Sequence, residues 1–157
     1  MRTRLQTDIQ QQHPFDSLEQ EALLNVLRTA DVFMQRISAA LKPYGLSHSQ
    51  YNVLRILRGA GADGLACREI GDRMITRDPD ITRLLDRLEA RELVTRTRDQ
   101  QDRRVVMARI TPEGVRLLAE LDGPMVEVDR RSLDHMGEPR LRSLIALLEA
   151  AREREGG

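Results

Sequence analysis

The 157-residue chain has the length of one domain, because folding at that size buries roughly 70% of the unfolded surface. It carries 25 basic and 25 acidic side chains, so its net charge of zero marks neither a nucleic-acid binder nor an acidic tail. Of the basic residues 24 are arginine and only Lys42 is a lysine. The planar guanidinium of arginine can donate two parallel hydrogen bonds to a phosphate or a base edge, which lysine cannot. Aromatic residues make up 3% of the chain and tryptophan is absent, which argues against stacking platforms for single strands.

The cysteine content and the hydropathy of the chain limit the cellular compartments in which we expect the protein. The single cysteine excludes an intramolecular disulfide framework and any multi-cysteine metal centre. The N-terminus does not resemble a signal peptide, and no run of about 18 apolar residues occurs. We therefore expect a cytoplasmic protein.

The N-terminal third predicts an arm followed by a long helix. Residues 1–16 are polar and lack periodicity, so we expect a flexible N-terminal arm, with one domain over residues 17–154. Apolar residues recur at alternating steps of four and three from Leu23 to Leu41, which predicts a helix over about 17–42.

Short elements follow in the middle of the chain. Ser47-x-x-Gln50 has the form of a capping box and predicts a helix that ends in the glycine-bounded stretch 59–64. A very short strand at 65–66 and a two-turn helix over 68–74 come next. Asp78 is expected to cap a further helix that has Pro79 at its first position and runs to about residue 91.

A hairpin and two more helices complete the chain. Residues 94–98 and 104–110 are rich in β-branched residues and flank the charged stretch 99–103, which predicts a β-hairpin. Helix resumes over about 112–154, with a break near Gly137 and Pro139. The fold class is thus mainly α with a small β-hairpin wing: a winged helix-turn-helix over about 46–110.

One face of the predicted 81–91 helix is the first candidate for binding. Thr82, Arg83 and Arg87 lie opposite its apolar side, and positions 83 and 87 project together from a helix that fits a major groove. The same face also suits an ordinary solvated helix, because Asp86 and Glu89 lie nearby.

The hairpin favours DNA binding. Four arginines against two aspartates give a local excess of +2 over the nine residues 96–104. A wing at that place can follow phosphates or insert an arginine into a minor groove. The residues are Arg96, Arg98, Arg103 and Arg104, with Asp99 and Asp102.

Several of these segments together resemble a known family. Residues 81–89 read ITRLLDRLE and are followed by Leu93-Val94, by Asp102-Arg103-Arg104 and by the ITPEG stretch at 110–114. In this order and at this spacing they resemble the MarR family of bacterial transcription regulators, over about residues 17 to 152. The resemblance implies a homodimer with interleaved dimerisation helices at about 17–42 and 112–154. It further implies two lobes that each read half of a pseudo-palindrome in double-stranded DNA, in a ligand-responsive repressor.

The resemblance also assigns roles to residues. Thr82, Arg83 and Arg87 would enter the major groove, and Arg104 the minor groove, with Asp102 orienting Arg104. Phosphate or groove-edge contacts would fall to Arg96 and Arg103.

Two departures from the family pattern affect the predicted interface. Glu92 stands where such regulators commonly have glycine, and left-handed backbone there would cost about 1 kcal/mol relative to glycine. Asp78 and Asp80 flank the start of the recognition helix, where a carboxylate repels phosphate unless it caps the helix or accepts from cytosine N4.

The same sequence is compatible with other functions and partners. The apolar stripes of the terminal helices exceed what one lobe covers, which predicts a homodimer; the alternative is an intramolecular helical bundle. The alternative function is a helical effector-binding or protein-interaction module without specific DNA recognition. Cys67 is interpreted either as a redox sensor or as a small buried residue. The resemblance implies a small-molecule effector, whose binding residues stay unassigned.

Catalysis and metal binding find little support in the sequence. No phosphate-binding loop or nucleophile motif occurs, so we expect no enzyme and no cofactor. The three histidines lack paired ligand spacing, so we expect no metal site. They are His13, His48 and His135.

Overall fold

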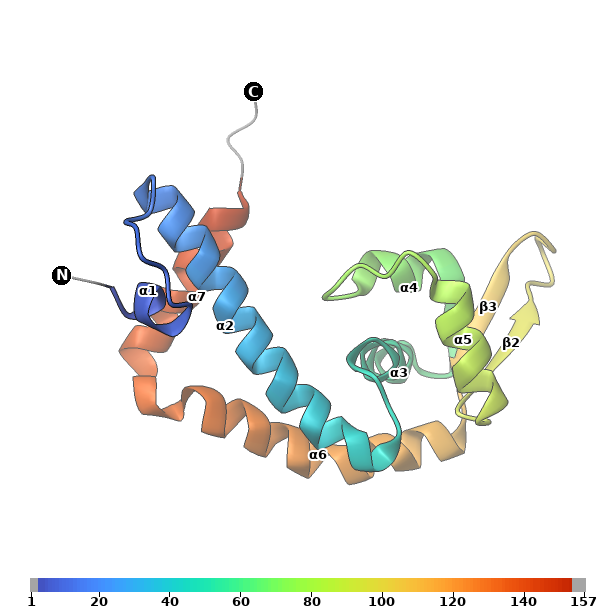
Figure 1. Ribbon diagram of the computed structural model, residues 1–157. Coiled ribbons are helices and arrows are strands. Elements are labelled where there is room, and N and C mark those ends of the chain that lie inside the picture. Colours follow the sequence, from blue (N-terminus) through green and yellow to red (C-terminus); the bar gives the residue numbers. More distant parts are fainter. Residues whose placement is uncertain (1–2, 154–157) are drawn as a thin grey trace.

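The computed structural model describes residues 3–153, so the first two residues of the expected arm and the expected domain end at residue 154 lie outside it. The chain is mainly helical with a small three-stranded antiparallel sheet, as predicted (Figure 1). Two long helices, α2 (Leu18–Leu41) and α6 (Pro112–Leu133), pack on each other and carry a lobe of three helices and the sheet. Within residues 3–153 no helix is long and apolar enough to cross a lipid bilayer.

The segment expected as a flexible arm contains a helix, α1 (Arg4–Asp8). Thr3 Oγ1 accepts a hydrogen bond from the Gln6 amide, and Gln6 Oε1 accepts one from the Thr3 amide at 2.9 Å. Leu5 is buried, so one apolar contact and a capping box order a segment that looks mobile by composition. The Thr3-x-x-Gln6 spacing is the sequence signal of this capping box.

The first two helices of the lobe form where the sequence predicts them. At the start of α3 (His48–Ala60), Ser47 Oγ accepts from the Gln50 amide at 3.1 Å, and Gln50 Oε1 accepts from the Ser47 amide at 2.9 Å. The short strand β1 (Leu65–Ala66) leads into α4 (Cys67–Arg73). The predicted helices α3 and α4 and the short strand between them are confirmed.

The start of α5 (Ile81–Ala90) differs from the prediction. Asp80 caps this helix in place of Asp78, because its Oδ1 accepts from the Arg83 amide at 2.9 Å. Asp78 Oδ1 instead accepts from the Asp80 amide at 2.9 Å, and Pro79 lies before the helix. Two neighbouring carboxylates both suit a cap, and the sequence alone does not choose between them.

The sheet has the order β1-β3-β2. Strands β2 (Val94–Arg98) and β3 (Val106–Ile110) form the predicted hairpin, with Val94 opposite Ile110 and Arg98 opposite Val106. Strand β3 begins two residues later than expected, because the Val105 amide donates to the Asp102 carbonyl at 2.9 Å and closes a turn.

The core fills the space among α3, α5, the sheet and α6. An ion pair joins the lobe to the long helices: Arg58 on α3 donates through both Nη atoms to the two carboxylate oxygens of Asp122 on α6, each at 2.9 Å. The arginine lowers the pKa of Asp122. Side chains with almost no exposure include Leu41, Leu54, Leu57, Ile70, Leu85, Leu88, Leu118 and Leu121.

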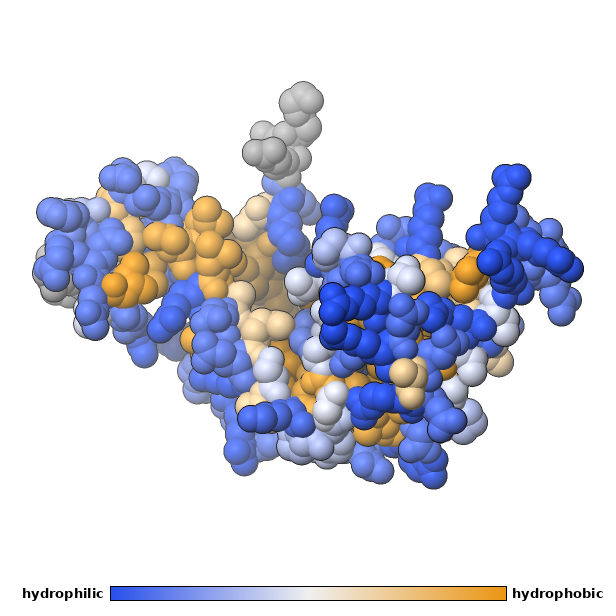
Figure 2. Space-filling view, turned by 45° about the vertical axis from the view of Figure 1, so that its right-hand side comes forward, coloured by the Kyte–Doolittle hydropathy of each residue, from blue (hydrophilic) through white to orange (hydrophobic). Residues whose placement is uncertain are grey.

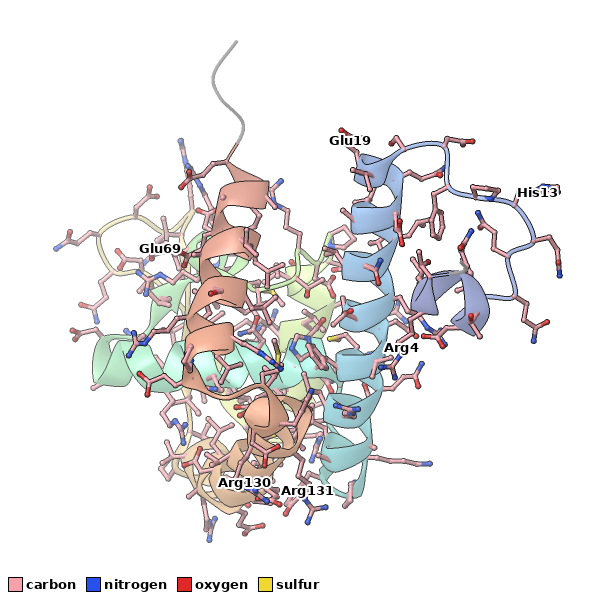
Figure 3. The ribbon with its side chains drawn as sticks, turned by 90° about the vertical axis from the view of Figure 1, so that its left-hand side faces the viewer. Arg4, His13, Glu19, Glu69, Arg130 and Arg131 are labelled. Atoms are coloured by element: carbon pink, nitrogen blue, oxygen red, sulfur yellow. The ribbon has the colours of Figure 1, made fainter. Side chains whose placement is uncertain are left out.

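The last helix is α7 (Glu138–Arg152), and none of its described residues is buried. It follows the break predicted near Gly137. Figure 3 shows α7 and α2 as two upright helices, and Figure 1 shows α7 beside the N-terminal half of α2, at the end of the molecule away from the lobe. Three 3-10 turns complete the elements: η1 (Lys42–Tyr44), η2 (Gly61–Asp63) and η3 (Asp134–Met136).

Two glycines of α6 offer a matched test of packing. A Cβ added at Gly114 would lie 2.4 Å from the Leu93 carbonyl oxygen, whereas one at Gly123 would meet nothing within 4 Å. We expect G114A to lower the free energy of unfolding by about 1–3 kcal/mol through overpacking. G123A should raise it by up to about 1 kcal/mol, because alanine is the better helix former. Urea unfolding measures both; equal effects would contradict the close approach at Gly114.

Candidate nucleic-acid interface

Helix α5 presents one apolar and one polar face. Leu84, Leu85 and Leu88 are buried in the lobe, whereas Thr82, Arg83 and Arg87 are exposed, as the sequence predicts. A shallow hollow of about 250 Å³ lies on the exposed side of the helix. It is lined by Asp78, Asp80, Arg83, Leu84 and Arg87. Within residues 3–153 the guanidinium groups of Arg83 and Arg87 enter no ion pair, so they remain available to a ligand.

At the tip of the hairpin, the acids bond to the backbone and the arginines project outward. Asp99 Oδ1 accepts from the Gln101 amide at 2.7 Å and from the Asp102 amide at 3.0 Å, and these bonds lower the pKa of Asp99. Asp102 Oδ1 accepts from the main-chain amide of Arg104 at 3.0 Å. Asp102 therefore positions the backbone of Arg104 and leaves its guanidinium exposed. The Arg103 side chain is exposed as well.

Arg96 lies apart from the other predicted contacts. Its Nη2 donates to Asp86 Oδ1 at 2.5 Å and to Glu89 Oε2 at 2.6 Å, and its main-chain amide donates to Glu89 Oε1 at 3.1 Å. Only 21% of its side chain is exposed. The hydrogen bond to Arg96 lowers the pKa of Glu89, and the pKa of Arg96 is raised in turn. We call these three residues the Arg96 cluster; it joins the wing to α5. The expected phosphate contact of Arg96 stays a prediction, and it would require these bonds to open.

The cluster explains how a chain of zero net charge exposes a cationic surface. Asp86 and Glu89 are paired with Arg96, and four aspartates bond to backbone amides at the helix start and wing tip. On α5 and the wing, four exposed guanidinium groups make neither an ion pair nor a hydrogen bond within residues 3–153. They belong to Arg83, Arg87, Arg103 and Arg104.

Three side chains join separate elements through long-range bonds that the sequence analysis missed. Arg91 donates to the carbonyls of Tyr44 and Gly45 at 3.0 and 2.9 Å. Asn52 and Arg109 bond to the backbone of other elements: Asn52 Oδ1 accepts from the Ile75 amide at 2.9 Å, and Arg109 Nε donates to the Ala62 carbonyl at 3.1 Å. No local pattern signals such bonds, because the partners are 23 to 47 residues apart.

Other candidate sites are weaker. Burial raises the pKa of the Cys67 thiol, the opposite of what a reactive cysteine needs. No group of three or more possible metal ligands occurs within residues 3–153. Burial lowers the pKa of His48, and Figure 3 shows His13 at the outer edge, in the segment between α1 and α2.

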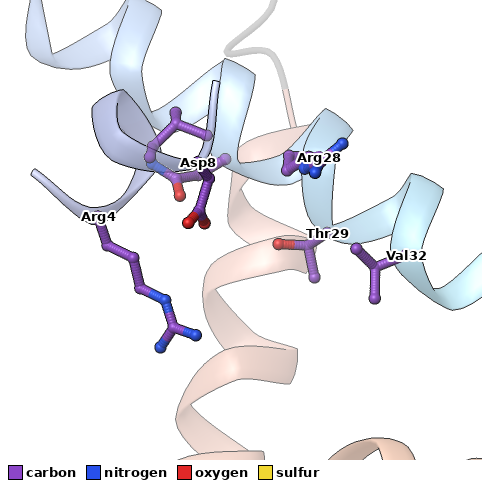
Figure 4. Close-up of a pocket in the computed structure, with 7 residues that line it drawn as sticks. Arg4, Asp8, Arg28, Thr29 and Val32 are labelled. Atoms are coloured by element: carbon purple, nitrogen blue, oxygen red, sulfur yellow. The ribbon is translucent and has the colours of Figure 1, made fainter. Parts of the chain in front are cut away.

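A second hollow lies between α1 and α2. It has about 500 Å³ and is open; Figure 4 shows Arg4 and Asp8 on one side and Arg28, Thr29 and Val32 on the other. Small-molecule pockets enclose their ligands with mainly apolar walls, so this charged hollow is a poor candidate for one.

A short helix, a turn and an exposed helix, followed by a two-stranded wing, define a winged helix-turn-helix protein. The family model described as MarR family matches residues 46–106. The crystal structure of a MarR transcription factor from Planctomyces limnophilus is 42% identical, with a TM-score of 0.68 over 87% of this chain and 99% of that chain. The chain belongs to the MarR family.

Further relatives agree with this assignment. The HTH-type transcriptional regulator PrsX of Escherichia coli is 34% identical over 69% of this chain and 64% of its own length. MhqR of Bacillus subtilis is 36% identical over 50% of this chain and 52% of its own. The chain thus spans between about half and two thirds of these curated relatives. CouR from Rhodococcus jostii, solved with p-coumaroyl-CoA, is 27% identical, with a TM-score of 0.72 over 87% of this chain and 95% of that chain.

The Arg96 cluster can be tested by stability. R96M keeps the apolar stem of the side chain but leaves Asp86 and Glu89 unpaired, so we expect a loss of about 1–2 kcal/mol in the free energy of unfolding. R103M, at an exposed arginine of the same hairpin, should change it by less than about 0.5 kcal/mol. Urea unfolding monitored by circular dichroism measures both variants. Equal stability of the two would contradict the stabilising role of the Arg96 cluster.

Proposed function

We propose that the protein is a homodimeric, sequence-specific binder of double-stranded DNA that regulates transcription as a ligand-responsive repressor. The proposal rests mainly on one observation: four exposed arginines on two adjacent elements, α5 and the wing, have guanidinium groups with no ion pair or hydrogen bond in the described chain. An α-helix fits the major groove, and a wing arginine fits a narrow minor groove, where the potential is most negative.

Each residue receives a role in this proposal. Thr82, Arg83 and Arg87 read base edges or phosphates in the major groove, Arg104 enters the minor groove, and Arg103 contacts phosphate. Asp102 holds the backbone at Arg104. Arg96 is assigned to support of α5.

Exposed apolar surface supports the homodimer. Leu23 and Leu27 on α2 are 60% and 57% exposed, and Ile145 and Leu147 on α7 are 56% and 69% exposed. Figure 2 shows hydrophobic side chains gathered at the end of the molecule where α2 and α7 lie. Exposed apolar side chains of this kind favour burial against a second copy. We propose the dimerisation helices at about 17–42 and 112–154, and the DNA-binding lobe at about 46–110.

Regulation would act through the spacing of the two lobes. Binding at an operator excludes polymerase, and an effector that favours a spacing unlike one helical turn, about 34 Å, releases the repressor. CouR carries a bound aromatic thioester in its crystal structure, which supports a small-molecule effector here. A role on the bacterial chromosome implies a cytoplasmic protein that regulates rather than catalyses.

Selection of bound fragments from the source genome tests DNA recognition. At about 0.15 M salt the chain should enrich a pseudo-palindrome with half-sites one turn apart. R83A should weaken binding by about 1–3 kcal/mol and relax the preference at one base pair, and R104A should weaken binding to the same operator. R116A, an arginine that pairs with Glu113 inside α6, is the matched control. Two outcomes would favour the alternative, an effector-binding or protein-interaction module without specific DNA recognition. One is that R104A binds every duplex with wild-type affinity. The other is that binding is lost at this salt concentration and no sequence is enriched.

Light scattering tests the dimer independently. We expect a mass of twice 17.9 kDa at micromolar concentration, because α7 and the N-terminal half of α2 need a partner for their apolar residues. L23E places a charge on that surface and should shift the mass toward the monomer. A monomeric mass for the unaltered chain at micromolar concentration would refute the dimer.

A further inference from the structure

The C-terminal end of the recognition helix α5 meets the lobe-facing ends of both long helices. On one side is Arg91, which directly follows α5. Its Nη1 donates to the Gly45 carbonyl at 2.9 Å and its Nη2 to the Tyr44 carbonyl at 3.0 Å. These carbonyls belong to the turn that ends α2, so one guanidinium joins α5 to α2.

Gly45 is suited to this contact. Its φ of +65° is left-handed and ends η1, and the carbonyls of Tyr44 and Gly45 both face one guanidinium. A Cβ at Gly45 would lie 3.5 Å from Arg91 Nη1, so the arginine packs directly on the turn. A planar fork that donates to two acceptors fixes direction as well as distance.

On the other side, the residues that follow α5 hold the start of α6. Glu92 has a φ of +58°, and its carbonyl accepts from Thr111 Oγ1 at 2.7 Å. The Thr111 amide donates to the Leu93 carbonyl at 3.0 Å. The same hydroxyl caps α6 by accepting from the Gly114 amide at 3.0 Å. Both long helices are therefore bonded to one end of α5.

We propose that Arg91 is a positioning residue that sets the direction of the recognition helix relative to α2, and so the separation of the two recognition helices in the dimer. This inference rests on the proposed function. Arg91 is exposed and adds little to the core, so its loss leaves each lobe able to bind a half-site. A palindrome gains affinity because the second lobe binds at high effective concentration, and that gain needs the correct spacing.

R91M tests the assignment, because methionine keeps an apolar stem and removes both donors. Its affinity is measured on the operator that the wild-type chain selects, on the same duplex cut to one half-site, and on operators with one or two inserted base pairs. We expect the ratio of operator to half-site affinity to fall about tenfold, with half-site affinity unchanged and a smaller penalty for the insertions. R116M should behave as wild type.

Each outcome decides the matter. A wild-type ratio and a wild-type insertion penalty for R91M would overturn the assignment. Half-site affinity that falls as far as operator affinity would overturn it too, since Arg91 would then support the lobe itself or contact DNA. If the wild-type chain selects no duplex at all, the proposed function fails, and the inference falls with it on different evidence.

Discussion

The bond between Arg96 and the two carboxylates of α5 fixes the geometry of the whole exposed surface. A two-stranded wing has little core of its own and needs an anchor on the body of the protein. Arg96 provides it, because its guanidinium and its main-chain amide both bond to Glu89 while Nη2 also reaches Asp86. The wing and α5 are therefore joined by these bonds as well as by the buried residues Val94 and Ala108 of the strands.

The acidic side chains near α5 and the wing are also used for bonds within the protein. Carboxylates near the surface cap a helix, close the wing turn or pair with Arg96, and each role places negative charge close to a backbone amide or an inward guanidinium. Positive charge is left on the side that the proposed ligand would approach. Net charge is a sum over the chain and does not report this arrangement.

Local features were predictable from sequence, and contacts across elements were not. Ser47 caps its helix as expected, because capping joins residues three positions apart. The hairpin also follows from local composition. Arg96 looked like its neighbours in the wing, and only the packing of β2 against α5 shows that it turns inward. Arg91 gives no local sign at all, since its acceptors lie 46 and 47 residues away.

The charge balance of the chain affects how the protein would distribute between an operator and non-specific DNA. Binding to random DNA depends on the number of phosphates neutralised, and a chain with a net charge of zero is only weakly attracted to bulk chromosome. A genome offers about 10⁶–10⁹ competing positions, so weak bulk binding leaves a larger fraction of molecules free to search. Under the proposed function, a small number of copies can then keep a single operator occupied.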